Sequence, residues 1–260
     1  PFLFREKGEW YLFFEVISGL PGQGNIRFAV SGDLSRWRYG GVALDEPFHL
    51  FFFFEQQTAY EIYMIPETHE VDAVRLYRAV LFPAQWEYVR TLVSAVAVSD
   101  ASILQAGGKW WLFAGNTACD TLRLYHADRL QGPWQEHPKS PIYEGNVFFS
   151  RPAGRIVTEG SRIIRFSQQG IPVYGRQVWA FEILKMTEKE YEERLLSDRP
   201  VLSPTGGVAW NGQGMHHIDL HRLDSGEWIA AVDGFRERCG TAAFMNSVLN
   251  RSGKFFQRIF

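Results

Sequence analysis

The stretch WYLFFE at residues 10–15 decides the fold, because related six-residue segments recur four times along the chain. They are IYMIPE at 62–67, WWLFAG at 110–115, IIRFSQ at 163–168 and WIAAVD at 228–233. Their starts are separated by 52, 48, 53 and 65 residues. Each segment is rich in β-forming residues, and four of the five follow a turn that contains glycine. This pattern predicts the second strand of a repeated hairpin.

A second repeat alternates with the first: IRFAVSGDLSRW at 26–37, VRLYRAVLFPAQW at 74–86 and LRLYHADRLQGPW at 122–134. Its copies start 48 residues apart each time. One unit then holds about four strands, the content of one propeller blade, which must stack on neighbouring blades to bury its faces. We predict an all-β fold, a five-bladed β-propeller. A β-sandwich is the alternative, but the constant step favours the propeller.

Two segments fall outside the repeats. Thr187 and Glu190 have the spacing of a capping box, and Tyr191 and Leu195 then share one helical face. This predicts a short surface helix before the last blade. Residues 253–260, GKFFQRIF, are the candidate for a late strand that pairs beside the first blade and closes the ring.

Composition excludes several classes of protein. A chain of 260 residues with 46% hydrophobic content can form one domain with a large core. A net charge of −2 without a basic cluster argues against a nucleic-acid partner, and no apolar run is long enough for a membrane span. Cys119 and Cys239 are too far apart for a CxxC zinc site. Since the chain opens on Pro1 without Met, we expect a piece of a longer protein, and its localisation cannot be predicted.

Equivalent positions of the repeats select the candidate functional residues, because the innermost strands of a propeller converge on one axial channel. The last position of the first repeat gives Glu15, Glu67, Gly115, Gln168 and Asp233, and a polar position before the hairpin gives Asp100, Arg151 and His217. Two or three carboxylates near one axis are what glycoside cleavage requires. Crowding raises the pKa of one of them, which keeps an acid protonated near neutrality.

Other side chains in these segments suit sugar binding. Arg151 can bind a carboxylate or phosphate, or form a structural ion pair with Asp100. Gln168 can bond sugar hydroxyl groups or hold a loop. Trp210 lies among glycines in a predicted loop, which makes it a ligand candidate, whereas the tryptophans inside predicted strands are expected in the core.

The motif MHHIDLH at residues 215–221 brings three histidines and a carboxylate together. Alternation along a strand sends His217, Asp219 and His221 to one side and His216 to the other. One metal ion cannot reach all of them, so no metal site is assigned. His217 is expected to point into the channel opposite Asp100, and His216 and Asp219 are further candidates for substrate contacts.

Several segments together resemble the N-terminal domain of plant glucosamine inositolphosphorylceramide transferases: PFLFREKGEWYLFFE, YEIYMIPE, DASILQAGGKWWLFAG, RPAGRI, the Tyr174-Gly175 pair and GMHHIDLHRL. Similar bacterial domains are found beside formyltransferase-like modules. The domain is in turn similar to the five-bladed propellers of glycoside hydrolase family 43.

The resemblance implies roles for particular residues. Asp100 matches the second Asp of the hydrolase family. Glu67 is the candidate proton donor, and Glu15 is the candidate for a substrate or orienting contact. The chain departs from the pattern. The sequence starts at the Pro that follows the general-base Asp in the hydrolase relatives, so that Asp is either cut off or absent, and Gln169 stands where a further Asp is expected. No cofactor is required, although a calcium ion in the channel remains open, because family-43 relatives often hold one there.

Three functions are therefore weighed. The first is binding of a glycan or sugar-nucleotide moiety in the axial pocket, beside a covalently attached glycosyl- or formyl-transferase module. The second is an autonomous family-43 glycosidase that acts through paired carboxylates. The third is a protein-interaction propeller.

Overall fold

The computed structural model describes residues 1–18, 23–48, 50, 53–57, 61–94, 98–236 and 256–259. These ranges contain twenty β-strands and one 3₁₀ helix, η1 (His69–Val71), and no α-helix. The predicted all-β class is therefore confirmed for the described part of the chain.

The strands form five antiparallel sheets in chain order. The first sheet contains β1 (Phe2–Glu6), β2 (Glu9–Ser18), β3 (Gln23–Ser31) and β4 (Arg38–Leu44), and the second contains β5 (Phe53–Gln57), β6 (Ile62–Pro66), β7 (Ala73–Leu81) and β8 (Gln85–Ser94). The third contains β9 (Val98–Ala106), β10 (Lys109–Asn116), β11 (Leu122–Ala127) and β12 (Gln135–Glu136). The fourth contains β13 (Arg151–Pro152), β14 (Val157–Glu159), β15 (Arg162–Gln168), β16 (Val178–Met186) and β17 (Tyr191–Leu195), and the fifth contains β18 (Ile218–Arg222), β19 (Trp228–Val232) and β20 (Phe256–Ile259).

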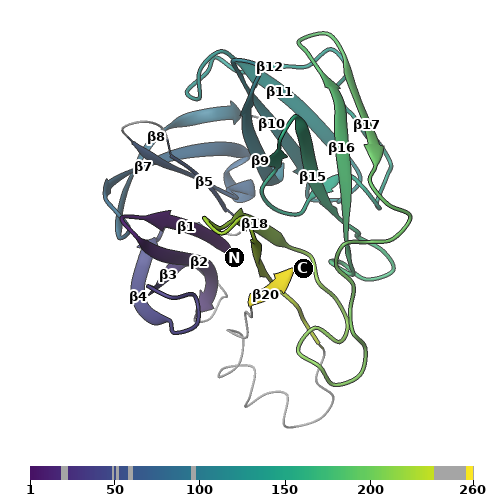
Figure 1. The fold of residues 1–260 in the computed structure, drawn as a ribbon. Helices are drawn as coiled ribbons and strands as arrows, with labels where there is room; N and C mark the ends of the chain where they lie inside the picture. The colour runs from purple at the N-terminus through teal and green to yellow at the C-terminus, as the bar shows by residue number, and fades with distance from the viewer. Residues whose placement is uncertain are drawn as a thin grey trace.

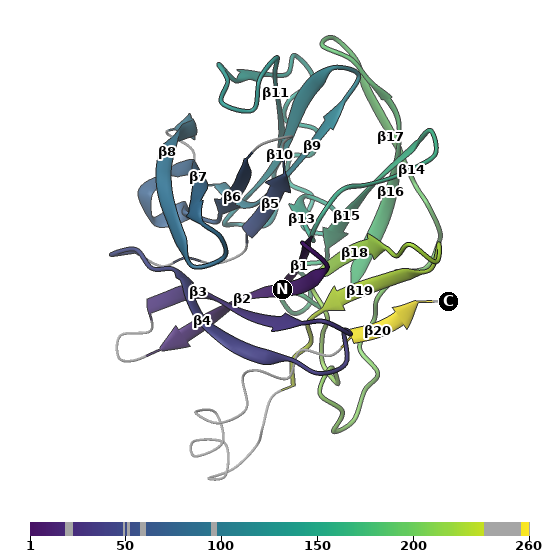
Figure 2. The same cartoon turned by 60° about the vertical axis from the view of Figure 1, so that its left-hand side comes forward.

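The first strands of the five sheets meet around a common centre (Figures 1 and 2). β1 contacts β5, β5 contacts β9, β9 contacts β13, and β18 contacts β1. A parallel bridge between Gly154 and Ile218 joins the segment just after β13 to β18. This is the arrangement of a β-propeller. The prediction of blades with about four strands is confirmed for four sheets, while the last sheet has three strands among the described residues.

The turns of the first-repeat hairpins lie at the glycine positions that the sequence predicted. Lys7 and Gly8 adopt positive φ angles of 50° and 85° between β1 and β2. The other turns use glycine at positive φ in the same way: Gly107 and Gly108, Gly160, and Gly226. Glycine reaches this region without a Cβ clash, so it lets two paired strands reverse within a few residues.

The core fills the spaces between adjacent sheets. The largest cluster joins the first three sheets through side chains such as Phe13, Leu76 and Leu112. A separate cluster packs Leu3 of the first sheet against Ile229 of the fifth. Burial of each such side chain contributes about 1.5–3 kcal/mol. Apolar contact therefore closes the ring between its first and last sheets.

The predicted surface helix before the last blade is wrong. Tyr191–Leu195 is the edge strand β17, paired with β16. Thr187 Oγ1 accepts hydrogen bonds from the backbone N–H groups of Lys189 and Glu190, at 3.3 and 3.0 Å. A turn and a helix N-cap use the same side-chain-to-backbone bond, so the local pattern did not distinguish them.

The predicted closing strand is confirmed as a strand but not in its position. Within residues 253–260, the described part is β20, which pairs antiparallel with β19 of the fifth sheet instead of lying beside the first blade. The rest of that segment lies outside the described residues.

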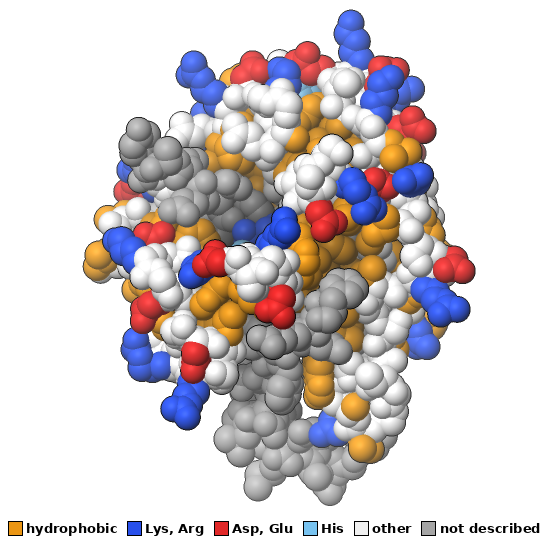
Figure 3. All heavy atoms as spheres, viewed as in Figure 1, with side chains coloured by type: hydrophobic (Ala, Val, Ile, Leu, Met, Phe, Trp, Pro, Cys, Tyr) orange, Lys and Arg blue, Asp and Glu red, His pale blue; other side chains and the backbone are white. Residues whose placement is uncertain are grey.

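The surface carries charges of both signs. Figure 3 shows Lys, Arg, Asp and Glu side chains interspersed with hydrophobic groups over one face of the molecule. No helix in the described ranges is long and apolar enough to cross a membrane.

Candidate functional site at the centre of the propeller

Four polar side chains from three sheets meet in a buried cluster, which we call the axial cluster: Glu67, Asp100, Arg151 and Gln168. Arg151 donates through Nε to Oδ2 of Asp100, and its Nη2 lies 3.7 Å from Oε2 of Glu67. Gln168 donates through Nε2 to the same Asp100 oxygen, at 2.7 Å. The propeller thus brings together residues that are up to 101 positions apart in sequence, from 67 to 168.

Asp100 has an unusual backbone conformation. Its φ is +53°, in the left-handed region, where the register between β9 and β10 shifts. In this position its N–H donates to Oε2 of Glu67 at 3.0 Å. Backbone strain of this kind costs about 1–3 kcal/mol and concentrates at functional sites. Here the strained residue turns a backbone donor toward a buried carboxylate of the neighbouring sheet.

The two carboxyl groups titrate in opposite directions. Burial raises the pKa of Asp100 to about 7; the charge of Arg151 opposes the rise, and the nearby Glu67 carboxylate reinforces it. Burial also acts to raise the pKa of Glu67, but the hydrogen bond from His69 and the charge of Arg151 outweigh it and lower that pKa. As the pH falls, Asp100 therefore takes up a proton first while Glu67 keeps its charge.

The acceptor oxygen of Gln168 has no partner among the described residues. Its amide nitrogen donates both to Asp100 and to the carbonyl of Pro152, at 2.7 and 2.9 Å. The side chain is only 2% exposed, and its Oε1 is buried without a hydrogen bond. A buried carbonyl oxygen without a donor costs about 1–3 kcal/mol, so this atom suits a ligand hydroxyl or N–H group.

A rim of aromatic and acidic groups adjoins the axial cluster. The guanidinium of Arg151 lies 5.0 Å from the ring centre of Tyr174, and the Tyr174 and His216 rings are 5.4 Å apart. His216 Nδ1 lies 2.6 Å from Oδ2 of Asp233. The N–H groups of His216 and His217 both donate to Oδ1 of Asp233. Asp233 therefore fixes the MHH segment beside the cluster.

His217 and Asp219 lie in the contact between the first and last sheets. His217 is 1% exposed, its Nε2 lies 2.6 Å from the Pro1 carbonyl, and its ring packs on Phe2. Burial lowers its pKa well below the usual value, so the ring is neutral. Asp219 accepts from the N–H of Leu3 at 2.6 Å and from Arg155 at 2.8 Å. These contacts give both residues a structural role in ring closure.

The remaining candidates occupy other places. Glu15 is half-buried in β2, opposite Ile26 of the first sheet. Trp210 is half-buried in the loop before β18 and packs close to Gly234. As predicted, Trp10, Trp110 and Trp111 are buried in the core.

Sequence reasoning missed His69 and gave Tyr174 no role in the site. His69 Nδ1 lies 2.8 Å from Oε1 of Glu67, and its pKa is raised by the hydrogen bond to that carboxylate. The signal was its position in η1, two residues after the acid that ends the second repeat copy. The possibility of a calcium ion in the channel is not tested by the structure. Among the described residues, no three His, Cys, Asp or Glu side chains are grouped as metal ligands.

Comparisons with known proteins identify the family of the chain. A family model described as "Glucosamine inositolphosphorylceramide transferase 1, N-terminal" matches residues 1–235. The rice (Oryza sativa subsp. japonica) protein glucosamine inositolphosphorylceramide transferase 1 is 37% identical over 92% of this chain, and the Arabidopsis thaliana protein of that name is 34% identical over 92%. The chain spans 33% and 32% of their lengths, about a third.

Solved structures agree on the fold. A putative glycoside hydrolase from Parabacteroides distasonis superposes with a TM-score of 0.69 at 11% identity, over 90% of this chain and 84% of that one. A family-43 β-1,3-galactosidase superposes with a TM-score of 0.63 at 13% identity, over 90% and 85%. The model match over residues 1–235 and the identity to the plant proteins show that this chain belongs to the family of the N-terminal domain of glucosamine inositolphosphorylceramide transferase 1.

Proposed function

We propose that this domain binds a glycan or the sugar moiety of a sugar nucleotide at the axial cluster, in a protein that also carries a transferase module. The observation that carries the proposal is the Gln168 Oε1 atom, which is buried beside a charged cluster and has no donor among the described residues. Sugar hydroxyl groups supply both donors and acceptors, so they match Gln168, Asp100 and Arg151 together.

The transferase association rests on length and family. The curated relatives are about three times as long as the matched segment, and their names describe a transferase. A sugar-binding domain attached to such an enzyme would hold a donor or acceptor near it. We also propose that the sheet of β18, β19 and β20 acts as the fifth blade, since it contacts the first sheet.

Hydrolysis is less well supported than binding. Arg151 contacts the carboxylates of both Asp100 and Glu67, and Glu67 also accepts the backbone N–H of Asp100 at 3.0 Å, so the two acids are held close together. Glycosidases keep their two carboxyl groups about 5–9.5 Å apart, so that the sugar or a water molecule fits between them. In addition, Arg151 and Gln168 already bond the Asp100 carboxylate. This geometry favours a structural and binding role for the pair.

The test is isothermal titration of the protein with neutral sugars, oligosaccharides and sugar nucleotides. Gln168→Leu should weaken binding about tenfold, because the buried polar contacts with the sugar are lost. Gln105→Leu, on an exposed position of β9, is the matched control and should bind like the wild type. Absence of binding to every sugar probe contradicts the proposal. Release of aryl alcohol from aryl glycosides, lost in Asp100→Asn and Glu67→Gln, would establish the hydrolase alternative instead.

A further inference from the structure

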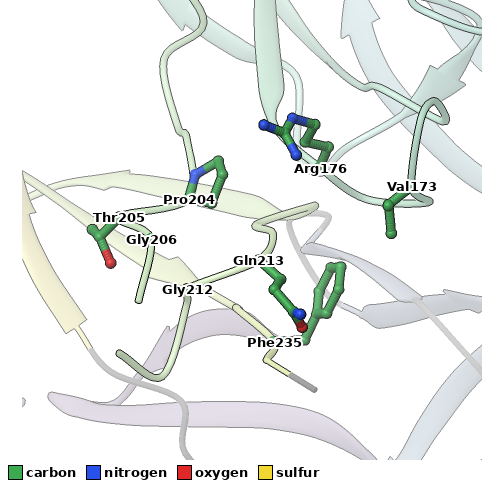
Figure 4. Close-up of a pocket in the computed structure, with 8 residues that line it drawn as sticks. All are labelled: Val173, Arg176, Pro204, Thr205, Gly206, Gly212, Gln213 and Phe235. Atoms are coloured by element: carbon green, nitrogen blue, oxygen red, sulfur yellow. The ribbon is translucent and has the colours of Figure 1, made fainter. Parts of the chain in front are cut away.

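A pocket lies between the fourth and fifth sheets, outside the axial cluster. Its volume is about 450 Å³. Three segments line it: the loop between β15 and β16, the loop between β17 and β18, and the segment after β19. In Figure 4, Arg176 faces Gln213 and Phe235 across the pocket, with Pro204 and Thr205 on one side and Val173 on the other.

Backbone hydrogen bonds tie these three segments together. Gln213 N–H donates to the Phe235 carbonyl, and Phe235 N–H donates to the Gly214 carbonyl, each at 3.1 Å. Met215 N–H donates to the Arg176 carbonyl at 3.3 Å. A Cβ at position 214 would lie 2.2 Å from the Phe235 ring, so the segments pack at a distance that only glycine allows. The pocket is therefore held open by bonded backbone before any ligand arrives.

Arg176 is the only charged residue among the eight that line this pocket. The buried arginines Arg151 and Arg165 each face a carboxylate, Asp100 and Glu193 respectively. Arg176, by contrast, is half-buried and has no acidic partner among the described residues. An unpaired guanidinium in a partly enclosed space has a high affinity for an anion, since burial weakens its competing hydration.

The other lining groups indicate what the anion is attached to. Val173, Pro204 and Phe235 give the pocket apolar walls, while Thr205 and Gln213 add hydrogen-bonding groups. Free inorganic phosphate has no apolar surface to place against these walls. A phosphate ester has both parts, a charged group that suits the Arg176 fork and an organic group that suits the walls.

We propose that this pocket binds a phosphate ester, with its phosphoryl oxygens on Arg176 and its organic group against Val173, Pro204 and Phe235. The inference stands apart from the proposed glycan site, because it uses none of the four residues of the axial cluster. The two sites are neighbours, however: a Cβ on Gly175, which precedes Arg176, would lie 2.7 Å from His216 on the rim of the cluster.

The test is titration of the protein with glucose, glucose 1-phosphate, inorganic phosphate and uridine diphosphate glucose at low salt. Glucose 1-phosphate should bind at least about tenfold more tightly than glucose or inorganic phosphate, since only the ester satisfies both parts of the pocket. Arg176→Gln should remove this gain. Arg199→Gln, an exposed arginine in the loop after β17, is the matched control and should retain it.

A second variant tests the pocket independently, in case Arg176→Gln does not fold. Val173→Asp places a carboxylate on a wall residue that is 45% exposed, and should repel the phosphate without disturbing the core. In Gln168→Leu, glucose 1-phosphate should still bind more tightly than glucose, because this variant changes only the axial cluster. Failure of the glycan site is therefore distinguishable from failure of this pocket. Equal binding of glucose and its phosphate, binding of no phosphate probe, or an unchanged gain in Arg176→Gln would each overturn the inference.

Discussion

The guanidinium of Arg151 in β13 donates to the carboxylate of Asp100 in β9, and this buried ion pair joins the third and fourth sheets. The side chains of the two residues are 9% and 2% exposed. The same guanidinium stacks near Tyr174 and approaches Glu67. Arg151 is therefore the one group of the axial cluster that touches the second, third and fourth sheets and the rim.

Replacement of Arg151 by Met should destabilise the fold. The change leaves two buried carboxyl groups without their cation, and loss of one partner from a buried pair costs about 3–5 kcal/mol. Urea denaturation measures the effect. Arg123→Met breaks an exposed pair with Glu136 and serves as control, with an expected loss of about 0–1 kcal/mol. Equal losses in the two variants would contradict the assigned role of Arg151.

The stability contributed by Asp100 should fall as the pH rises. Its folded pKa of about 7 lies above the ordinary value of an Asp side chain, 3.8, so the folded state binds the extra proton between these values. This contribution is complete below the unfolded pKa and is lost as the pH rises through the folded pKa. Asp100→Asn imitates the protonated form but cannot lose a proton, so it should remove this dependence of stability on pH.

The comparison of wild type with Asp100→Asn isolates this effect from Glu67, Asp219 and Asp233, whose lowered pKa values act in the opposite direction. Between about pH 5 and about pH 8, the wild type should lose about 1–3 kcal/mol relative to the variant. Denaturation midpoints at the two pH values give the difference. A difference that does not change with pH would show that Asp100 is ionised throughout.

Ring closure should depend on Asp219 far more than on a nearby exposed acid. Asp219 is 0% exposed and bonds Leu3 and Arg155, whereas the exposed Asp224 pairs with Arg5 between the same two sheets. Asp219→Ala should cost about 3–5 kcal/mol and Asp224→Ala about 0–1 kcal/mol. Thermal and urea unfolding measure both. Near-equal midpoints would mean that apolar packing alone closes the ring.

Gly175 should tolerate no side chain. Its φ is +69°, and a Cβ there would lie 2.7 Å from Cβ of His216. Gly160 has a similar φ of +61° with nothing near its Cβ position. Gly160→Ala should cost only the left-handed strain of about 1–2 kcal/mol, and Gly175→Ala should cost more. Denaturation compares the two variants, and glycan titration of Gly175→Ala should show weaker binding if the His216 rim contributes. Equal stabilities would contradict the tight contact.

The candidate site could be predicted only as a set of positions. Repeat alignment selected Glu67, Asp100, Arg151 and Gln168, and the structure brings these four together. The alignment could not show that Arg151 would pair with Asp100. A contact to a ligand carboxylate or phosphate and an ion pair with Asp100 fit the sequence equally well. His69 and Tyr174 lie outside the repeat positions, so the repeat alignment did not select them; the place of His69, two residues after Glu67, was the one signal for its contact.

The sequence by itself determined the strands, the hairpin turns and the repeated sheets, because alternation and glycine turns act over a few residues. Tertiary structure decided the state of one ambiguous segment and the long-range partners of the polar residues. Tyr191–Leu195 became a strand because it pairs with β16, although its local spacing fits a helix. His217 and Asp219 became closing contacts because Pro1 and Leu3 lie beside them, 216 positions away in the chain. Partners at such separations are set by the packing of whole sheets, which no local pattern records.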